Sequence, residues 1–153
     1  MQRYTFRELQ ESDLSWFVVL RNSVREMLHN PSVFNLQDAR EWFPNSDTSY
    51  WIVELTGQRV GYFRITNTGL NQVMIGADID PLFQGKGIAS TAYPIFVREI
   101  LIPRGVSQLE LRVLKKNERA IKLYKKLGFV IDGQTSRDFH MSVQTNKLKS
   151  EDD

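Results

Sequence analysis

Alternating and helical patterns of apolar residues divide the chain into short strands and helices. Apolar and polar positions alternate in segments such as YTFRE and YWIVEL, as expected for strands that bury one face. The strands that we predict are residues 4–8, 50–55, 59–66, 72–80, 109–114, 129–132 and 138–145. Apolar residues recur at helical spacing elsewhere, and the predicted helices are residues 13–28, 36–43, 86–102 and 117–127. This mixed order predicts an α/β (mixed α+β) domain.

Prolines and glycines mark the ends of these segments. A Thr56-Gly57-Gln58 turn predicts a hairpin between the second and third strands. His29-Asn30-Pro31 is expected to end the first helix, since a residue before proline is disfavoured in the helical region. Pro94 falls inside the third predicted helix, where it removes a hydrogen bond to the Ser90 carbonyl and predicts a kink. Gly128 occupies the position of a helix C-cap.

No repeat or linker interrupts the chain. Its 153 residues suffice for one domain with a buried core. We therefore expect a single domain over residues 1–146, followed by a polar, disordered tail over residues 147–153.

Composition and charge narrow the function classes. Hydrophobic residues make up 41% and charged residues 25% of the chain, and the net charge is +2, so neither disorder nor nucleic-acid binding is indicated. The chain has no cysteine and its histidines are His29 and His140, which argues against a metal site. No segment has the pattern of a signal peptide or a membrane span. We expect a soluble, cytoplasmic protein without a membrane partner, as a monomer or a homodimer.

Residues 80–90, DPLFQGKGIAS, place two glycines between a predicted strand and a predicted helix. In one interpretation the segment is a tight turn whose glycines take positive φ. In the other, successive backbone N–H groups at the start of the helix bind a phosphate, which the helix dipole also attracts. A Walker A loop is excluded because Asp80 stands where its first glycine belongs. Ser90 stands where a dinucleotide fingerprint needs glycine, so that motif fails as well.

A second motif lies in residues 109–130, LELRVLKKNERAIKLYKKLGFV. Helical spacing places Tyr124 on one apolar face with Ala120, Leu123 and Leu127. Asn117 precedes the helix in the position of an N-cap. Taken alone, these features are typical of an ordinary helix that packs on a core.

Together, the two segments resemble the GNAT superfamily of acyl-CoA-dependent N-acetyltransferases. That family pairs strand–Q/R-x-x-G-x-G/A–helix with a downstream strand–N-E-R-A-I-x-L-Y-x-K-x-G-F. QGKGIA at 84–89 is similar to the first motif with a shifted glycine spacing, and NERAI, Tyr124 and LGF at 127–129 match the second nearly residue for residue. YTFRELQESDL, LRNS, QDAREWF and VGYFRI extend the resemblance over most of the chain. LRN and EWF in particular are similar to the branch acting on amino-sugar nucleotides or protein N-terminal amines.

The resemblance implies a central, mostly antiparallel twisted sheet that splays between strands 4 and 5 and is flanked by about four helices. Acetyl-CoA would bind as a cosubstrate, without a metal, with its pantetheine arm between residues 72–80 and 109–114. The backbone around Ile79 would polarise the thioester carbonyl. The expected cofactor-binding residues are Ile79, Gln84, Gly85, Lys86, Gly87, Ile88, Ala89, Ser90, Asn117 and Arg119, with Lys115 and Lys116 as further candidates for phosphate charge.

The implied reaction is direct attack of a neutral primary amine on acetyl-CoA in a ternary complex. Tyr124 occupies the family's tyrosine position and would protonate the leaving thiolate. Many relatives carry glutamate where this chain has Met74, so the motif does not supply the base. Alternation along residues 72–80 places Asp78 opposite the apolar face, and Asp78 is our candidate base. The alternatives are Glu54, Glu110, His140 and a water relay.

The acceptor amine is expected to meet the first helices and the hairpin. This region is rich in aromatic residues and also holds Arg21, Arg25 and Arg64. Arg21 and Trp42 are the candidate substrate residues, and an arginine there would favour a substrate with a phosphate. A sugar amine, a peptide amine, a polyamine and an antibiotic all stay open. So does a non-catalytic acyl-CoA-binding or sensing module, because of Met74, and an unrelated nucleotide-binding domain.

Overall fold

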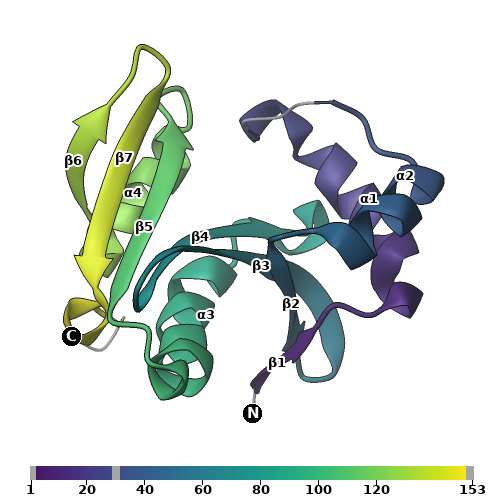
Figure 1. Cartoon of the computed structure of the whole chain (residues 1–153), viewed down its shortest axis with the longest axis horizontal. Coiled ribbons are helices and arrows are strands. Elements are labelled where there is room, and N and C mark those ends of the chain that lie inside the picture. The colour runs from purple at the N-terminus through teal and green to yellow at the C-terminus, as the bar shows by residue number, and fades with distance from the viewer. Residues whose placement is uncertain (1–2, 29–31, 151–153) are drawn as a thin grey trace. The chain divides into compact units, whose positions relative to one another are not determined.

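The computed structural model describes residues 3–28 and 32–150 (Figure 1), so the expected helix end at His29-Asn30-Pro31 lies outside the described residues. Its strands are β1 (Tyr4–Glu8), β2 (Ser49–Leu55), β3 (Gln58–Gly69), β4 (Gln72–Ile79), β5 (Gln108–Leu114), β6 (Val130–Gln134) and β7 (Asp138–Gln144). Its α-helices are α1 (Leu14–Ser23), α2 (Leu36–Trp42), α3 (Ile88–Phe96) and α4 (Glu118–Leu127). None of the described helices has the length and apolar character needed to cross a membrane.

The strands are hydrogen-bonded in the order β1-β2-β3-β4-β5-β7-β6. The pairs β1–β2, β2–β3, β5–β7 and β6–β7 are antiparallel, whereas β4 and β5 run parallel. The predicted mixed α+β fold, with a mostly antiparallel sheet and four α-helices in the described part of the chain, is confirmed.

The chain divides into two compact units. The N-terminal unit comprises Met1–Thr66 and Gly76–Lys86, and the C-terminal unit comprises Asn67–Ile75 and Gly87–Asp153. β3 and β4 each contribute residues to both units.

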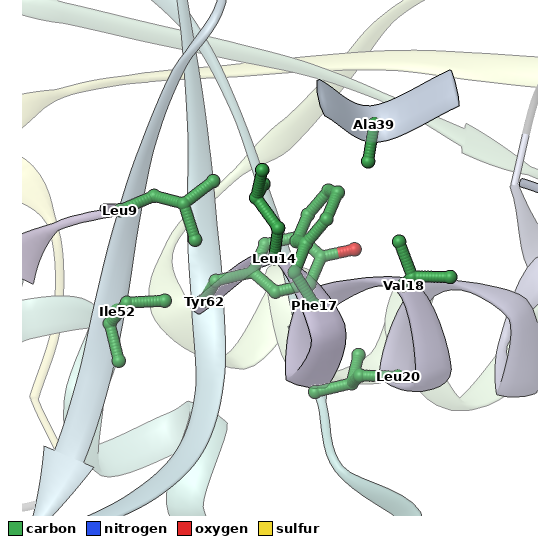
Figure 2. Packing of buried hydrophobic residues seen from close by; sticks show 8 residues of the cluster. All are labelled: Leu9, Leu14, Phe17, Val18, Leu20, Ala39, Ile52 and Tyr62. Carbon is green, nitrogen blue, oxygen red and sulfur yellow. The ribbon is translucent and has the colours of Figure 1, made fainter. Parts of the chain in front are cut away.

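An apolar cluster stabilises the N-terminal unit. The ring of Phe17 on α1 lies 5.1 Å from the ring of Tyr50 and 4.9 Å from that of Tyr62, so the helix packs directly on β2 and β3. Figure 2 shows the buried members of this cluster, which are Leu9, Leu14, Phe17, Val18, Leu20, Ala39, Ile52 and Tyr62. Their removal from water is the main favourable contribution to folding of this unit.

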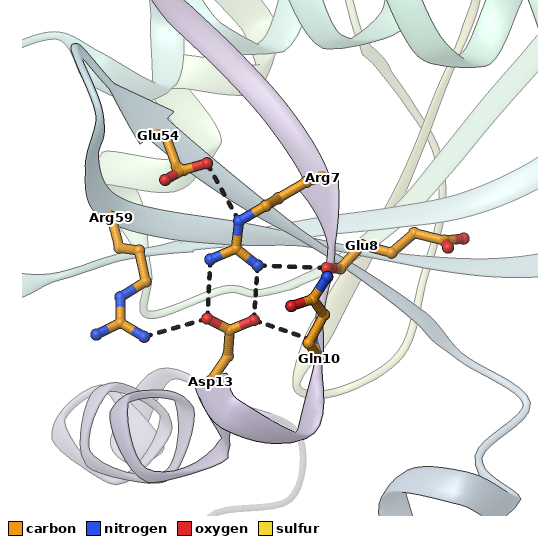
Figure 3. A network of polar contacts seen from close by, with 6 residues as sticks. All are labelled: Arg7, Glu8, Gln10, Asp13, Glu54 and Arg59. Carbon is orange, nitrogen blue, oxygen red and sulfur yellow. Dashed lines mark hydrogen bonds and ion pairs between the residues drawn. The ribbon is translucent and has the colours of Figure 1, made fainter.

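A group of charged residues, which we call the Asp13 knot, ties β1, β2 and β3 to the start of α1. It consists of Arg7, Asp13, Glu54 and Arg59 (Figure 3). Arg7 makes a two-pronged contact with the Asp13 carboxylate at 2.7 and 2.9 Å, and Arg59 Nη1 reaches the same carboxylate at 3.1 Å. Asp13 is only 2% exposed. The hydrogen bond from Arg7 outweighs the opposing effect of burial and lowers the pKa of Asp13 from 3.8 to about 2.

In the C-terminal unit, β5 alternates between a buried apolar face and a polar face. Leu109, Leu111 and Val113 are buried, whereas Glu110 and Arg112 point to the other side. β5, β7 and β6 lie side by side (Figure 1), and Arg112 is in register with His140 of β7. The polar side chains of neighbouring strands therefore gather on one face of this part of the sheet.

Several predicted boundaries were wrong for local reasons. The first helix ends at Ser23, and a 3-10 turn over Arg25–Met27 follows instead of an α-helix to residue 28. The Ser23 hydroxyl donates to the Leu20 carbonyl at 2.5 Å, a local bond that competes with helix continuation. The third helix begins at Ile88 rather than residue 86 and passes into a π-helical segment, Val97–Leu101, and then a 3-10 turn.

At its end the chain stays in contact with the C-terminal unit as far as it is described. Residues Thr145–Lys147 form a 3-10 turn, and the Lys149 N–H donates to the Leu127 carbonyl at 2.8 Å. The expected disorder of residues 147–153 stays a prediction, and residues 151–153 lie outside the described chain.

Candidate active site

The parallel pairing of β4 with β5 is short. It joins Gln72–Met74 to Gln108–Glu110, although β4 continues to Ile79 and β5 to Leu114. The predicted splay between strands 4 and 5 is thus confirmed. Met74 and Glu110 are the last paired residues, so Glu110 lies on the neighbouring strand beside the position where the family's glutamate is expected.

Side-chain and backbone bonds shape the loop between β4 and α3. The Asp80 carboxylate accepts from the Leu82 N–H at 3.0 Å and so starts the 3-10 turn Pro81–Phe83. The Gln84 side chain donates to the Ile79 carbonyl at 3.0 Å. Gln84 therefore fastens the loop to the end of β4, a role that the sequence alone did not reveal.

Both loop glycines adopt a conformation that other residues avoid. The φ angle is +79° at Gly85 and +74° at Gly87, in the left-handed region that favours glycine. Gly87 is the N-cap of α3 and supplies no side-chain cap. The N–H groups of Ile88 and Ala89 in the first helical turn have no intrahelical acceptor, and the helix dipole is positive there. The exposed loop thus has the features of an anion site and fits a pyrophosphate.

Tyr124 lies inside the C-terminal unit. Its ring packs against the rings of Tyr93 and Phe129 at 5.9 and 5.7 Å. The Tyr93 hydroxyl lies 3.5 Å from the Tyr124 hydroxyl. At the start of the same helix, Asn117 accepts from the Ala120 N–H at 3.3 Å, which confirms the predicted N-cap. Arg119, by contrast, is exposed.

Asp78 is tightly engaged within the N-terminal unit. Its Oδ2 accepts a hydrogen bond of 2.6 Å from the Tyr62 hydroxyl and lies 3.8 Å from Nε of Arg64. Burial, reinforced by the charge of Asp78, raises the pKa of Tyr62 well above its ordinary value, whereas Arg64 acts in the opposite direction. Tyr62 therefore keeps its proton and acts as the donor.

Two glycines make room for these neighbours. A Cβ atom on Gly61 would lie 2.5 Å from the backbone oxygen of Asp78, and a Cβ atom on Gly76 would collide with the guanidinium of Arg64. Neither glycine had a predicted role. Isolated glycines in predicted strands were the available signal, since they often mark close approach of another group.

A second polar group, which we call the polar row, lies on β4–β7 of the C-terminal unit. It consists of Gln72, Glu110, Asp132, His140 and Ser142. Gln72 donates to Oε2 of Glu110, and Nε2 of His140 lies 3.6 Å from the same oxygen. Nδ1 of His140 contacts Oδ1 of Asp132, and the Ser142 hydroxyl donates to Oδ2 at 2.6 Å. Glu110 and His140 were separate alternatives in the sequence, and their connection depends on strand pairing that the sequence does not show.

The candidate acceptor residues lie among the aromatic side chains of the N-terminal unit. Arg21 is 8% exposed, donates to the Ser32 carbonyl and lies 4.5 Å from the centre of the Phe34 ring. Trp42 stacks on Phe17 with ring centres 5.8 Å apart. Both residues thus take part in packing, and their contact with a substrate stays a prediction.

Within residues 3–28 and 32–150, no group of three or more histidine, aspartate or glutamate side chains is placed to hold a metal ion.

The chain thus combines a splayed mixed sheet, a glycine loop at a helix N-terminus and a buried tyrosine on the next α-helix. A family model described as an acetyltransferase (GNAT) domain matches residues 3–130. The chain belongs to this family, as its two motifs indicated, and GNAT acetyltransferases use acetyl-CoA.

Individual relatives give further comparisons. The spermidine N(1)-acetyltransferase of Escherichia coli strain K12 is 32% identical over 98 residues, which are 61% of this chain and 52% of that protein. The chain thus spans about half the length of the curated relatives it matches.

Among solved structures, a spermidine N-acetyltransferase from Vibrio cholerae in complex with CoA and spermine superposes with a TM-score of 0.82 at 20% identity, over 94% of this chain and 96% of that chain. A ribosomal-protein-alanine N-acetyltransferase from Brucella melitensis gives a TM-score of 0.75 at 20% identity, over 92% and 99%. At these identities the structures establish the fold alone.

Proposed function

We propose that the protein transfers an acetyl group from acetyl-CoA to the primary amine of a small molecule. The observation that carries the proposal is the loop from Gln84 to the first turn of α3, in which two left-handed glycines precede a helix N-terminus. Such a loop presents backbone donors and the positive end of a helix dipole to a pyrophosphate. Because the chain belongs to the acetyltransferase family, we expect this pyrophosphate to be that of CoA.

The other predicted cofactor contacts follow from this placement. We assign the amides of residues 84–90 to the pyrophosphate and the backbone at Ile79 to the pantetheine arm. Asn117 would contact the cofactor while it caps α4. The side chains of Lys86 and Arg119 are exposed, and the Lys86 ammonium lies 5.6 Å from the centre of the Phe83 ring. We assign both to the remaining phosphate charge.

The reaction would proceed by direct attack in a ternary complex. The amine nitrogen attacks the thioester carbonyl carbon, a C–N bond forms and the C–S bond breaks. A protonated primary amine gives up two protons on becoming an amide, of which one goes to the sulfur of CoA and one to solvent. We assign Tyr124 as the donor to the sulfur, because it holds a hydroxyl proton in a largely apolar site beside Tyr93 and Phe129.

For the acceptor we propose an aliphatic polyamine. The curated relatives act on spermidine by their names, and the N-terminal unit offers the chemistry that an alkylammonium needs. Tyr50 and Trp42 are partly exposed aromatic rings, 5.1 Å apart, and aromatic faces attract cations. Asp78 on β4 adds a carboxylate that is linked to these rings through Tyr62, whose ring lies 5.6 Å from that of Tyr50. An amino-sugar nucleotide is less well supported, since Arg21 already binds Ser32 and stacks on Phe34.

The test is CoA thiol release from acetyl-CoA with spermidine, an amino-sugar nucleotide and an alanine-terminated peptide as acceptors. Transfer to spermidine is the expected result. Selective transfer to either other acceptor would overturn the polyamine assignment, whereas acetyl-CoA binding without transfer to any amine would favour the non-catalytic binding module.

Two variants locate the site. Gly87→Glu is expected to abolish acetyl-CoA binding, because it adds bulk and negative charge to the loop. Gly57→Glu is the matched control, since Gly57 also has a positive φ, of +82°, but lies in the β2–β3 turn with nothing within 4 Å of an added Cβ.

Tyr124→Phe is expected to lower kcat by about 100-fold or more with an unchanged KM for acetyl-CoA.

A further inference from the structure

The polar row begins where the paired part of β4 and β5 ends. Glu110 is the last residue of β5 in register with β4, and its partner there is Met74. The carboxylate missing from β4 therefore has a counterpart on the adjacent strand.

Glu110 is arranged to accept a proton. Within the described chain, both contacts of its carboxylate are made by Oε2, which accepts from Gln72 and faces His140. The second oxygen, Oε1, is left with lone pairs for a further donor. The side chain is 14% exposed, enough for approach of a ligand while bulk water is largely excluded.

The row then leads outward from Glu110 in two steps. Nε2 of His140 lies 3.6 Å from the Glu110 carboxylate, and Nδ1 of the same ring contacts Asp132. The exposed fraction of the side chain rises from 14% at Glu110 to 33% at His140 and 41% at Asp132. Histidine is the side chain best suited to take up and release a proton near neutral pH, so the row connects a shielded carboxylate with solvent.

We propose that Glu110 accepts the proton that the acceptor amine sends to solvent, and that His140 passes this proton on toward Asp132. This inference rests on the proposed function. The amine gives one proton to Oε1 of Glu110, and rotation of the carboxyl group brings this proton toward Nε2 of His140. The imidazole takes it up at Nε2 while Nδ1 releases a proton to the Asp132 carboxylate, from which water removes it. The second amine proton replaces the one that Tyr124 donates to sulfur, so all protons are accounted for. Glu110 is the catalytic residue, and His140 and Asp132 act through it.

Asp78 lacks such a path. Its contacts are Tyr62, which donates its own proton, and Arg64, which stays protonated at all accessible pH values. Neither group can carry a proton away. A base must be reset in every turnover, and the surroundings of Glu110 provide for this whereas those of Asp78 do not.

The charged groups around His140 favour movement of the proton outward, from Glu110 toward Asp132. Carboxylates face it from two strands, Glu110 on β5 and Asp132 on β6. Arg112 is in register with His140, but its guanidinium is paired with Asp138 at 3.5 Å. Burial opposes ionisation of Asp132, yet hydrogen bonds from Ser142 and His140 lower its pKa, so it stays an anion at the outer end of the row.

The experiment is the pH dependence of kcat at saturating acetyl-CoA and saturating amine for the wild type and for E110Q, H140Q, D78N and E99Q. The wild-type kcat is expected to rise with pH as the row loses its proton. E110Q should lower kcat by about 100-fold or more and flatten this rise. H140Q should lower kcat less and shift the rise to a different pH range. D78N should keep the wild-type pH profile. Glu99 is an exposed glutamate outside the row, so E99Q is the matched control with unchanged kcat.

Thermal unfolding and acetyl-CoA affinity of each variant show whether it is folded and able to bind the cosubstrate. A folded E110Q with the wild-type pH profile would overturn the proposal while the acetyltransferase function stands. A flattened profile in D78N instead would return the role of base to Asp78. If the wild type transfers acetyl to no amine, the proposed function itself fails, and the assignment of Glu110 falls with it.

Discussion

The Asp13 knot and the polar row both combine carboxylates with basic side chains, but the group at the centre differs. In the knot, a carboxylate lies between the guanidinium groups of Arg7 and Arg59, whereas in the row an imidazole lies between the carboxylates of Glu110 and Asp132. Arginine does not release its proton in proteins, so the charges of the knot are fixed. Histidine does so readily, so the row can change charge during a reaction cycle. Whether the basic partner of the carboxylates is arginine or histidine thus separates a structural network from one suited to proton transfer.

The largest effect on stability is expected from Asp13→Asn. Lowering the pKa of Asp13 from 3.8 to about 2 corresponds to about 2 kcal/mol of folding free energy at neutral pH. The D13N variant lacks the carboxylate and should lose this stabilisation. Urea unfolding of wild type and variant at pH 7 measures this loss. Glu54→Gln serves as a control within the knot, because the hydrogen bond between Glu54 and Nε of Arg7 is longer, at 3.2 Å, and its loss should cost less. Equal midpoints for wild type and D13N would show that the knot contributes nothing.

The advantage of the wild type over D13N should depend on pH in a defined direction. Because folding lowers the pKa of Asp13, its contribution is fully present above pH 3.8 and disappears as the pH falls through about 2. Unfolding free energies of the two proteins, measured from neutral pH down into this window, are therefore expected to converge. A constant difference across the window would contradict the link to Asp13 ionisation.

Asp132→Asn, in contrast to Asp13→Asn, should affect the activity more than the stability. Asp132 is 41% exposed, and exposed ion pairs contribute at most about 1 kcal/mol, so the unfolding free energy should change little. The pH dependence of kcat should change, since the outer end of the row loses its charge. Parallel urea unfolding and steady-state assays make the comparison with D13N direct. A D132N protein that is strongly destabilised but has an unaltered pH profile would place the row among structural networks.

The smallest effect is expected from Ser142→Ala. The Ser142 hydroxyl donates to Asp132 at 2.6 Å at an exposed site, so its loss should cost about 0.5 kcal/mol or less. Thermal unfolding and kcat at one pH above and one below neutrality suffice as measurements. A fall in kcat as large as that of H140Q would mean that Ser142 is itself part of proton transfer.

Local features of the fold and the site were predictable from the sequence. The left-handed conformation of Gly85 and Gly87 and the Asn117 cap each follow from neighbouring residues. The helix after the loop was extended too far at both ends, because its pattern of apolar residues continues through the π-helical and 3-10 segments. Local patterns thus identified the elements but not the exact points where one backbone conformation gives way to another.

The partners of the candidate catalytic side chains were not predictable in this way. Tyr62 and Asp78 are 16 residues apart, and Gln72 and Glu110 are 38 residues apart. Their contacts depend on strand register, and a shift of one residue would turn each side chain to the other face. Alternation therefore separated Asp78 from the apolar face of β4 but did not reveal its contacts with Tyr62 and Arg64.

The close approach of Arg64 to Gly76 has a consequence for how this sequence can vary. Any side chain at residue 76 would meet the guanidinium of Arg64, so the end of this flexible side chain would have to shift from its position 3.8 Å from Asp78. The effect of a mutation at one position therefore depends on the residue present at the other, which is a case of epistasis fixed by geometry. A library that randomises position 76 should therefore return larger residues more often among folded clones when residue 64 is also shortened than when arginine is kept there.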